Sequence, residues 1–141
     1  MTQAKVLATG LTFGEGPRWH SGRLWFSDFY DHAVKSLDAA GNVRIELQLD
    51  DQPSGLGWLP DGRLLVVAMH QRRVLRRDAD GVKLHADLNS VATYHANDMV
   101  VAANGTAYVG NFGADMAAGE PRNDARLAIV RPDGTVLGGP E

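Results

Sequence analysis

The 141-residue chain contains no cysteine. This absence excludes a disulfide-stapled fold, thiol catalysis and any zinc site built on cysteine ligands. It fits a reducing compartment, and we expect a cytoplasmic protein. Residues 1–11 have no apolar core of signal-peptide length, and no apolar run approaches the length of a membrane span. The sequence therefore predicts no membrane partner.

The chain also lacks a large excess of charge of either sign. Its 14 basic and 17 acidic residues are interspersed, and the formal net charge is −3. With no basic cluster, the sequence predicts neither a nucleic-acid partner nor a polybasic contact with a membrane surface. The hydrophobic content of 44%, with 16 glycines and 6 prolines, indicates a turn-rich globular protein.

Apolar residues at helical spacing are missing too, and a pattern of short strands and turns repeats three times instead. The hairpin glycines recur about every 40 residues, at Gly22, Gly62 and Gly105. Glycines of a later turn recur at Gly41, Gly81 and Gly134. The larger gap before the last of these is explained by an insertion over residues 114–125.

Each copy contains the same four predicted elements. A short strand ends in the glycine turn, and a strongly apolar strand follows at 24–26, 64–67 and 107–109. Next come an alternating strand at 33–37, 73–77 and 127–131 and a polar strand at 43–49 and 82–86. Four short antiparallel strands at this period are typical of a β-propeller blade. We therefore predict an all-β fold of three four-stranded blades, at about 14–50, 54–90 and 97–137; the alternative, a β-sandwich of hairpins, explains the regular period less well.

Three blades do not close a propeller ring, which has about four to eight blades. We therefore expect a single partial propeller domain over residues 1–141 that belongs to a longer protein. The alternative is a half-ring that pairs with a second copy. Either way, we expect open apolar blade faces near Trp25 and Phe26 and near Tyr108 and Val109, through which the chain could self-associate.

Three oxygen-bearing residues occupy the same position in the three copies. Glu15, Ser54 and Asn97 each lie four residues before the matching position of the first strand. Equivalent positions in a propeller surround its axis, so the three side chains are predicted to converge at one end of the channel. Such oxygens suit a hard cation such as calcium or magnesium, or a borderline one such as zinc. The alternative is that Ser54 and Asn97 only cap turns.

Other polar residues have weaker patterns. A second set in register, Asp28, Ala68 and Asn111, ends the second strand of each copy, and its polar members fit ordinary turn residues. His70 and His95 could act as general bases or as substrate contacts. We favour His95, because it lies two residues before Asn97. The remaining histidines are predicted to be surface residues: His20, His32 and His85.

Five segments together resemble the SMP-30/gluconolactonase/regucalcin-like family. They read GEGPRW at 14–19, LWFSD at 24–28, PSGLG at 53–57, NDMVV at 97–101 and YVGNFG at 108–113. The resemblance covers most of the chain in order. It implies a six-bladed propeller that holds one divalent metal in its central channel. It also implies hydrolysis of sugar lactones or related cyclic esters, a carboxylic ester hydrolase activity with a small-molecule lactone as substrate.

The resemblance also assigns roles to individual residues. Glu15 matches a metal ligand, Asn97 matches a residue that binds metal or substrate, and His95 lies at a substrate-contacting position and is our candidate catalytic residue. Calcium is the metal we expect first, with zinc, magnesium and manganese as alternatives. A further Asn-Gly strand entrance and an Asp that serves as ligand and base are expected after Glu141. Two non-catalytic interpretations stay open. The chain could be a propeller fragment that only binds a divalent metal, or one that binds a sugar without hydrolysing it.

Overall fold

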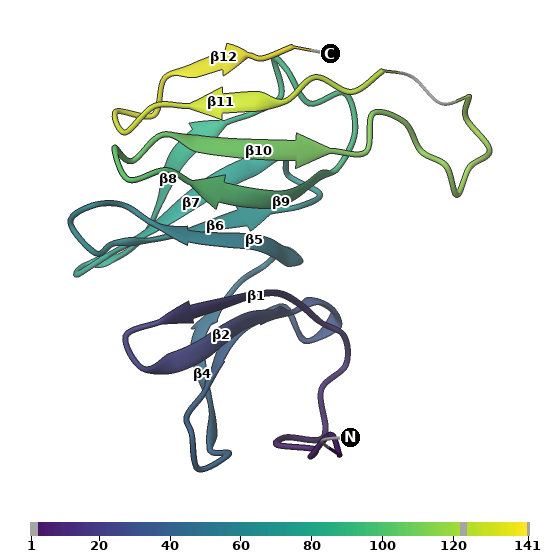
Figure 1. Cartoon of the computed structure of the whole chain (residues 1–141). Helices are drawn as coiled ribbons and strands as arrows, with labels where there is room; N and C mark the ends of the chain where they lie inside the picture. The colour runs from purple at the N-terminus through teal and green to yellow at the C-terminus, as the bar shows by residue number, and fades with distance from the viewer. Residues whose placement is uncertain (1–2, 122–123, 141) are drawn as a thin grey trace.

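The computed structural model describes residues 3–121 and 124–140. These residues form three four-stranded antiparallel sheets in which consecutive strands are neighbours, as the repeats predict (Figure 1). Within the described ranges, the only helical element is the 3-10 turn η1 (Phe29–Asp31). No helix there is long and apolar enough to span a bilayer.

The strand bounds follow the repeat pattern closely. The first sheet contains β1 (Gly14–His20), β2 (Arg23–Asp28), β3 (Ala33–Leu37) and β4 (Val43–Gln48). The second contains β5 (Pro53–Trp58), β6 (Leu64–Ala68), β7 (Arg73–Asp78) and β8 (Gly81–Asp87). The third contains β9 (Ala96–Val101), β10 (Ala107–Asn111), β11 (Ala128–Val130) and β12 (Val136–Gly138).

The first strands of the three sheets lie next to one another. Strand β5 contacts both β1 and β9, and the three strands run in the same direction (Figure 1). The approach of β5 to β9 depends on glycine. A Cβ atom at Gly55 would lie 2.3 Å from the Met99 amide nitrogen, and one at Gly57 would lie 2.3 Å from Val101 Cγ2. Only residues without a side chain permit such close backbone contact.

Strand alternation divides the apolar side chains between two cores. Leu65 and Val67 of β6 pack in the cluster between the second and third sheets, with Met99 and Val109. Their neighbour Val66 points the other way, into the cluster between the first and second sheets. That cluster also contains Trp25, Val34, Leu56 and Leu64. The second sheet is therefore covered on both faces.

Three of the four residues predicted to mark open apolar blade faces are buried, and only Tyr108 is exposed. Trp25 is 8% exposed because it faces the second sheet, and Val109 is fully buried because it faces the same sheet from the other side. Phe26 is 6% exposed, so the prediction was wrong for this residue too: the N-terminal segment lies at the same face, where Leu7 and Leu11 line one groove with Phe26. Tyr108 points away from the core and is 36% exposed, as predicted. The prediction for Trp25 and Val109 was wrong because adjacent residues of a strand point to opposite faces.

The prediction that His85 is a surface residue was also wrong. Its side chain is 8% exposed, on β8 near the third sheet. Burial, followed by the nearby Arg76 and Arg63, lowers the pKa of His85 below its ordinary value. The ring is therefore neutral at pH 7.

Asp28 anchors the N-terminal segment to the first sheet, which supports its interpretation as a structural residue. Its fully buried carboxylate accepts hydrogen bonds from Thr12 N (2.9 Å), Thr12 Oγ1 (2.6 Å) and Phe13 N (2.8 Å). The other oxygen accepts one from Lys35 Nζ at 2.7 Å. Burial alone would raise the pKa of Asp28, but these bonds, that of Lys35 foremost, lower it to about 2.

We expect Asp28→Asn to destabilise the fold and to remove part of its acid sensitivity. The pKa of Asp28 is about 2 in the fold, against an ordinary value of 3.8. Its ionisation therefore contributes stability above pH 4 that is lost as the pH falls towards 2, by about 2 kcal/mol. Urea titrations at pH 7 and at pH 3 measure this difference.

The matched control is Asp80→Asn, which removes an exposed carboxylate paired with Lys83 at 3.0 Å. We expect the control to unfold like the parent at both pH values. An Asp28→Asn variant that loses as much stability on acidification as the parent would contradict the assignment.

Candidate functional site

The three residues in register each occupy the second position of an inner strand. Glu15 follows the first residue of β1, Ser54 that of β5 and Asn97 that of β9. These strands begin on the same side of the molecule (Figure 1). Ser54 Oγ lies 3.2 Å from Asn97 Oδ1, within hydrogen-bonding distance across the boundary between two sheets. The structure thus brings Ser54 and Asn97 together.

Ser54 is held in place by the first sheet as well. Its side chain is 2% exposed, and its carbonyl accepts a hydrogen bond of 2.6 Å from Ser27 Oγ on β2. A Cβ atom at Gly16 would lie 3.2 Å from that same carbonyl oxygen. The backbone beside Glu15 therefore lies directly against Ser54.

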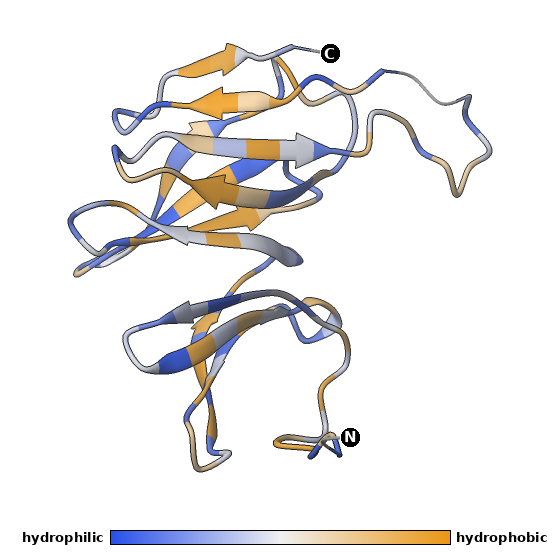
Figure 2. Cartoon of the chain, in the orientation of Figure 1, coloured by the Kyte–Doolittle hydropathy of each residue, from blue (hydrophilic) through white to orange (hydrophobic). Residues whose placement is uncertain are grey.

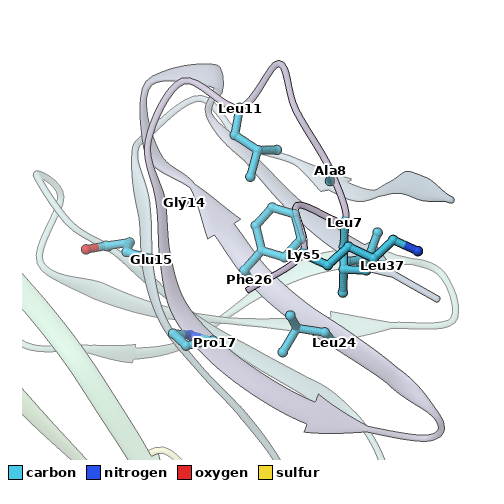
Figure 3. A pocket seen from close by; sticks show the side chains of 10 residues that line it. All are labelled: Lys5, Leu7, Ala8, Leu11, Gly14, Glu15, Pro17, Leu24, Phe26 and Leu37. Atoms are coloured by element: carbon cyan, nitrogen blue, oxygen red, sulfur yellow. The ribbon is translucent and has the colours of Figure 1, made fainter. Parts of the chain in front are cut away.

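Glu15 has an unsatisfied oxygen. Its Oε1 atom is buried and has no hydrogen-bond partner among the described residues. Figure 3 shows the carboxylate pointing away from the apolar side chains of Leu24 and Phe26, on the other side of β1. A buried carboxylate oxygen without a donor is costly unless a cation or another donor satisfies it.

These oxygens fit a hard cation. A carboxylate, a carboxamide and a hydroxyl oxygen are ligand types that calcium and magnesium accept. The described residues contain no cluster of three or more histidine, aspartate and glutamate side chains able to hold a metal ion. The candidate cation site therefore depends on neutral oxygens for part of its ligands.

His95 lies in a second polar cluster, just before β9. Its ring stacks on Tyr94, with centroids 4.0 Å apart, and lies 4.3 Å from the ring of His70. Burial, followed by the charge of His70, lowers the pKa of His95. The imidazole is therefore neutral at pH 7 and able to accept a proton. A hollow of about 290 Å³ lies here, and it is lined by the rings of His70, Tyr94 and His95 and by Arg72 and Thr93.

Asp51 is a residue of this region that the sequence did not indicate. Its carboxylate is 3% exposed and accepts hydrogen bonds from the backbone amides of Gln52 (2.8 Å) and Gln71 (2.8 Å). The amide of His70 also bonds to it at 3.3 Å, and the ring Nδ1 lies 3.4 Å away. Asp51 therefore fixes the loop that presents His70. An acid in a polar linker, Asp50-Asp51-Gln52, carries no periodic signal that could have revealed this role.

Arg18 is the second such residue. It lies on β1, yet its Nη2 atom donates to Asp98 Oδ1 at 2.8 Å and to the Met99 carbonyl at 2.7 Å. This contact joins the first sheet to the third, past β5. The partners are separated by 80 residues, so only the spatial arrangement of the repeats could have linked them.

The second set of residues in register is structural. Asn111 Oδ1 accepts from the Gly113 amide at 3.0 Å, and its Nδ2 donates to the Arg126 carbonyl at 2.9 Å. Asn111 therefore holds the turn after β10, and Asp28 holds the N-terminal segment against the first sheet. The turn interpretation of both residues is supported.

The comparison with protein families decides the family. The model of the SMP-30/Gluconolactonase/LRE-like region matches residues 13–137. The chain belongs to this family. A search of curated proteins found no match.

Solved structures show the same fold. A gluconolactonase from Xanthomonas campestris is 24% identical, with a TM-score of 0.71, over 94% of this chain and 48% of that one. A calcium-binding regucalcin from Agrobacterium tumefaciens is 23% identical, with a TM-score of 0.74, over 94% of this chain and 45% of the regucalcin. Virginiamycin B lyase from Staphylococcus aureus is 15% identical, with a TM-score of 0.64, over 86% of this chain and 39% of the lyase. The chain spans about half the length of these proteins or less.

We expect His70→Gln to raise the pKa of His95 towards its ordinary value. Removing the His70 ring removes a positive charge at 4.3 Å that disfavours protonation of His95. Burial persists, so the increase should be partial. Titration of the histidine ring protons by NMR measures both values, and His20→Gln serves as the control. An unchanged or lower pKa for His95 in the His70→Gln variant would contradict the coupling.

Proposed function

We propose that this chain carries part of the site of a divalent-cation-dependent hydrolase that opens a sugar lactone or a related cyclic ester. Membership of the SMP-30/gluconolactonase family supports the reaction class. The observation that carries the proposal is the buried, unpartnered Oε1 of Glu15 on β1, in register with the Ser54–Asn97 pair on the next two inner strands. No other described feature combines an unsatisfied carboxylate with neutral oxygens in register around the inner strands.

Glu15 and Asn97 are the proposed cation ligands, and Ser54 is a supporting residue. When bound, a divalent cation polarises a lactone carbonyl and lowers the pKa of water. Ser54 Oγ lies 3.2 Å from Asn97 Oδ1 and orients that carboxamide. Calcium is our first choice because all three side chains offer oxygen, and because a structurally similar regucalcin is a calcium-binding protein.

His95 is the proposed proton acceptor and substrate contact. Its lowered pKa keeps the ring neutral at pH 7, so it can take a proton from water as the water oxygen bonds to the lactone carbonyl carbon. The C–O bond of the lactone ring then breaks, and the leaving oxygen takes the proton held by His95 to give a hydroxy acid. The hollow beside His95 and Arg72 provides room for the polar groups of a sugar ring.

The activity test is acid release from δ-gluconolactone, with excess calcium, by the protein in which this chain continues past Glu141 into the rest of the site. We expect a rate above that of buffer, which EDTA removes and which falls in the His95→Gln variant. Equal rates with this protein, with its EDTA-treated form and with buffer would contradict the proposed hydrolase activity.

We expect Glu15→Ala to weaken divalent-cation binding by about tenfold or more, whereas Ser54→Ala weakens it only slightly. A carboxylate contributes far more to a hard cation than a hydroxyl does. Calorimetric titration with calcium, and with manganese as a second cation, measures the affinities.

The control is Asp61→Ala, which removes the same charge from the turn at the other end of the strands, where Asp61 pairs with Arg63 at 2.7 Å. Its affinity for calcium should match that of the parent. Equal calcium binding by the parent and Glu15→Ala would contradict the assignment of the ligand.

A further inference from the structure

The fourth strands of the first two sheets each contain a β-bulge. Glu46 is the unpaired residue of β4 and His85 is that of β8, because the strand pairing passes over each of them. A bulge adds one residue to a strand and redirects its side chain. Glu46 and His85 are therefore equivalent residues of two repeats, and both side chains are largely buried.

Each bulge residue lies at the boundary with the next sheet. Glu46 Oε2 lies 3.7 Å from Arg77 Nη1 on β7. His85 lies under the turn that joins β11 to β12, where a Cβ atom at Gly134 would overlap the His85 carbonyl oxygen. Gly134 has a φ of +89°, which glycine adopts without strain. The turn therefore packs its backbone directly on β8 at His85.

The two bulge residues differ in how their polar atoms are satisfied. The Glu46 carboxylate accepts hydrogen bonds from Ser36 Oγ and from Arg44 Nε as well as lying near Arg77. His85 Nδ1 lies 3.4 Å from Arg76 Nη1. An arginine only donates, so Nδ1 is the acceptor and the ring is neutral. The Nε2 atom is buried, and none of the described residues is its hydrogen-bond partner.

The surroundings of His85 offer little compensation for a second ring proton. The Arg76 guanidinium donates two hydrogen bonds to Asp78, at 2.7 and 2.8 Å, and Arg63 donates a third at 3.2 Å. Burial, then Arg76 and Arg63, lower the pKa of His85, which the turn opposes only in part. The charged groups around it come from every element packed there: Arg76 and Asp78 of β7, Arg63 and Asp61 of the turn after β5, Arg131 and Asp133 of the turn after β11, and Lys83 and Asp87 of β8 itself.

We propose that His85 is an acid-sensitive switch that holds the β11–β12 turn on β8 while its ring is neutral and releases the turn when the ring is protonated. A protonated ring there is a buried cation beside arginines, with no acceptor on Nε2. Figure 2 shows the contrast between β8, in which hydrophilic and hydrophobic residues alternate, and the mostly hydrophobic β11. The inference rests on this sheet boundary and not on the proposed hydrolase activity.

The equivalent boundary between the first two sheets should resist the same acid. Burial opposes ionisation of Glu46, but the hydrogen bonds of Ser36 and Arg44 lower its pKa below the ordinary value of 4.5. Glu46 therefore stays ionised at pH 5.0 and keeps its contact with Arg77. Mild acid should loosen one boundary and leave the other closed.

Hydrogen–deuterium exchange of the protein at pH 7.5 and pH 5.0, read by mass spectrometry and corrected for the intrinsic rates, tests the switch. The reporting segment is 128–138, where the Arg131 and Gly134 amides each donate a hydrogen bond of 2.9 Å within the turn. His85 in the open turn has its ordinary pKa of 6.5, so opening should increase by up to about 30-fold at pH 5.0. Segment 43–48 of β4 should stay protected at both pH values.

The variants His85→Gln and, independently, His85→Leu cannot take the proton, so segment 128–138 should stay protected at pH 5.0. Circular dichroism at pH 7.5 establishes that each is folded, and two variants keep the test decisive if one is not. The control is His20→Gln, which removes a histidine stacked on Trp58 at 4.0 Å and should open like the parent. Equal protection of the parent at both pH values would overturn the proposal, as would acid-induced opening of equal size in the parent and in a folded His85 variant.

Discussion

The close approach of β5 to β9 is the contact on which the candidate site depends. Gly55 and Gly57 allow the backbone of β5 to lie against Met99 and Val101. This contact sets the second residue of β5 beside the second residue of β9, and hence Ser54 beside Asn97. Any side chain at Gly55 would meet backbone atoms, which cannot move aside as a flexible side chain can.

The same geometry explains why a polar site can exist between apolar sheets. The two cores fill the space between the sheets and bury the alternating side chains of β6 and β10. The first residues of the inner strands β1, β5 and β9 are small or polar, and these strands lie next to one another. The Arg18–Asp98 ion pair then ties β1 to β9 directly. Among the described residues, Glu15 is the one whose buried carboxylate oxygen has no hydrogen-bond partner.

The sequence predicted the fold almost completely because the blade repeat is periodic. Turn glycines and apolar strands recur together, and the strand bounds follow from them within a few residues. The register also predicted which residues share a position, including Ser54 and Asn97. The register did not predict to which face of the sheet each side chain points. Trp25 and Phe26 are adjacent in β2 but lie on opposite faces of the first sheet. It also gave no sign of Asp51 or Arg18, whose partners are set by loop closure and by contact between sheets.

The central claim is that Glu15 and Asn97 bind one divalent cation at the start of the inner strands. A crystal grown with manganese, measured for anomalous scattering, tests it most directly. The account predicts an anomalous peak about 2.0–2.5 Å from an oxygen of Glu15 and from Asn97 Oδ1. A manganese ion bound elsewhere on the chain would contradict the claim. A structure with Glu15 and Asn97 on opposite faces of the sheets would contradict it as well.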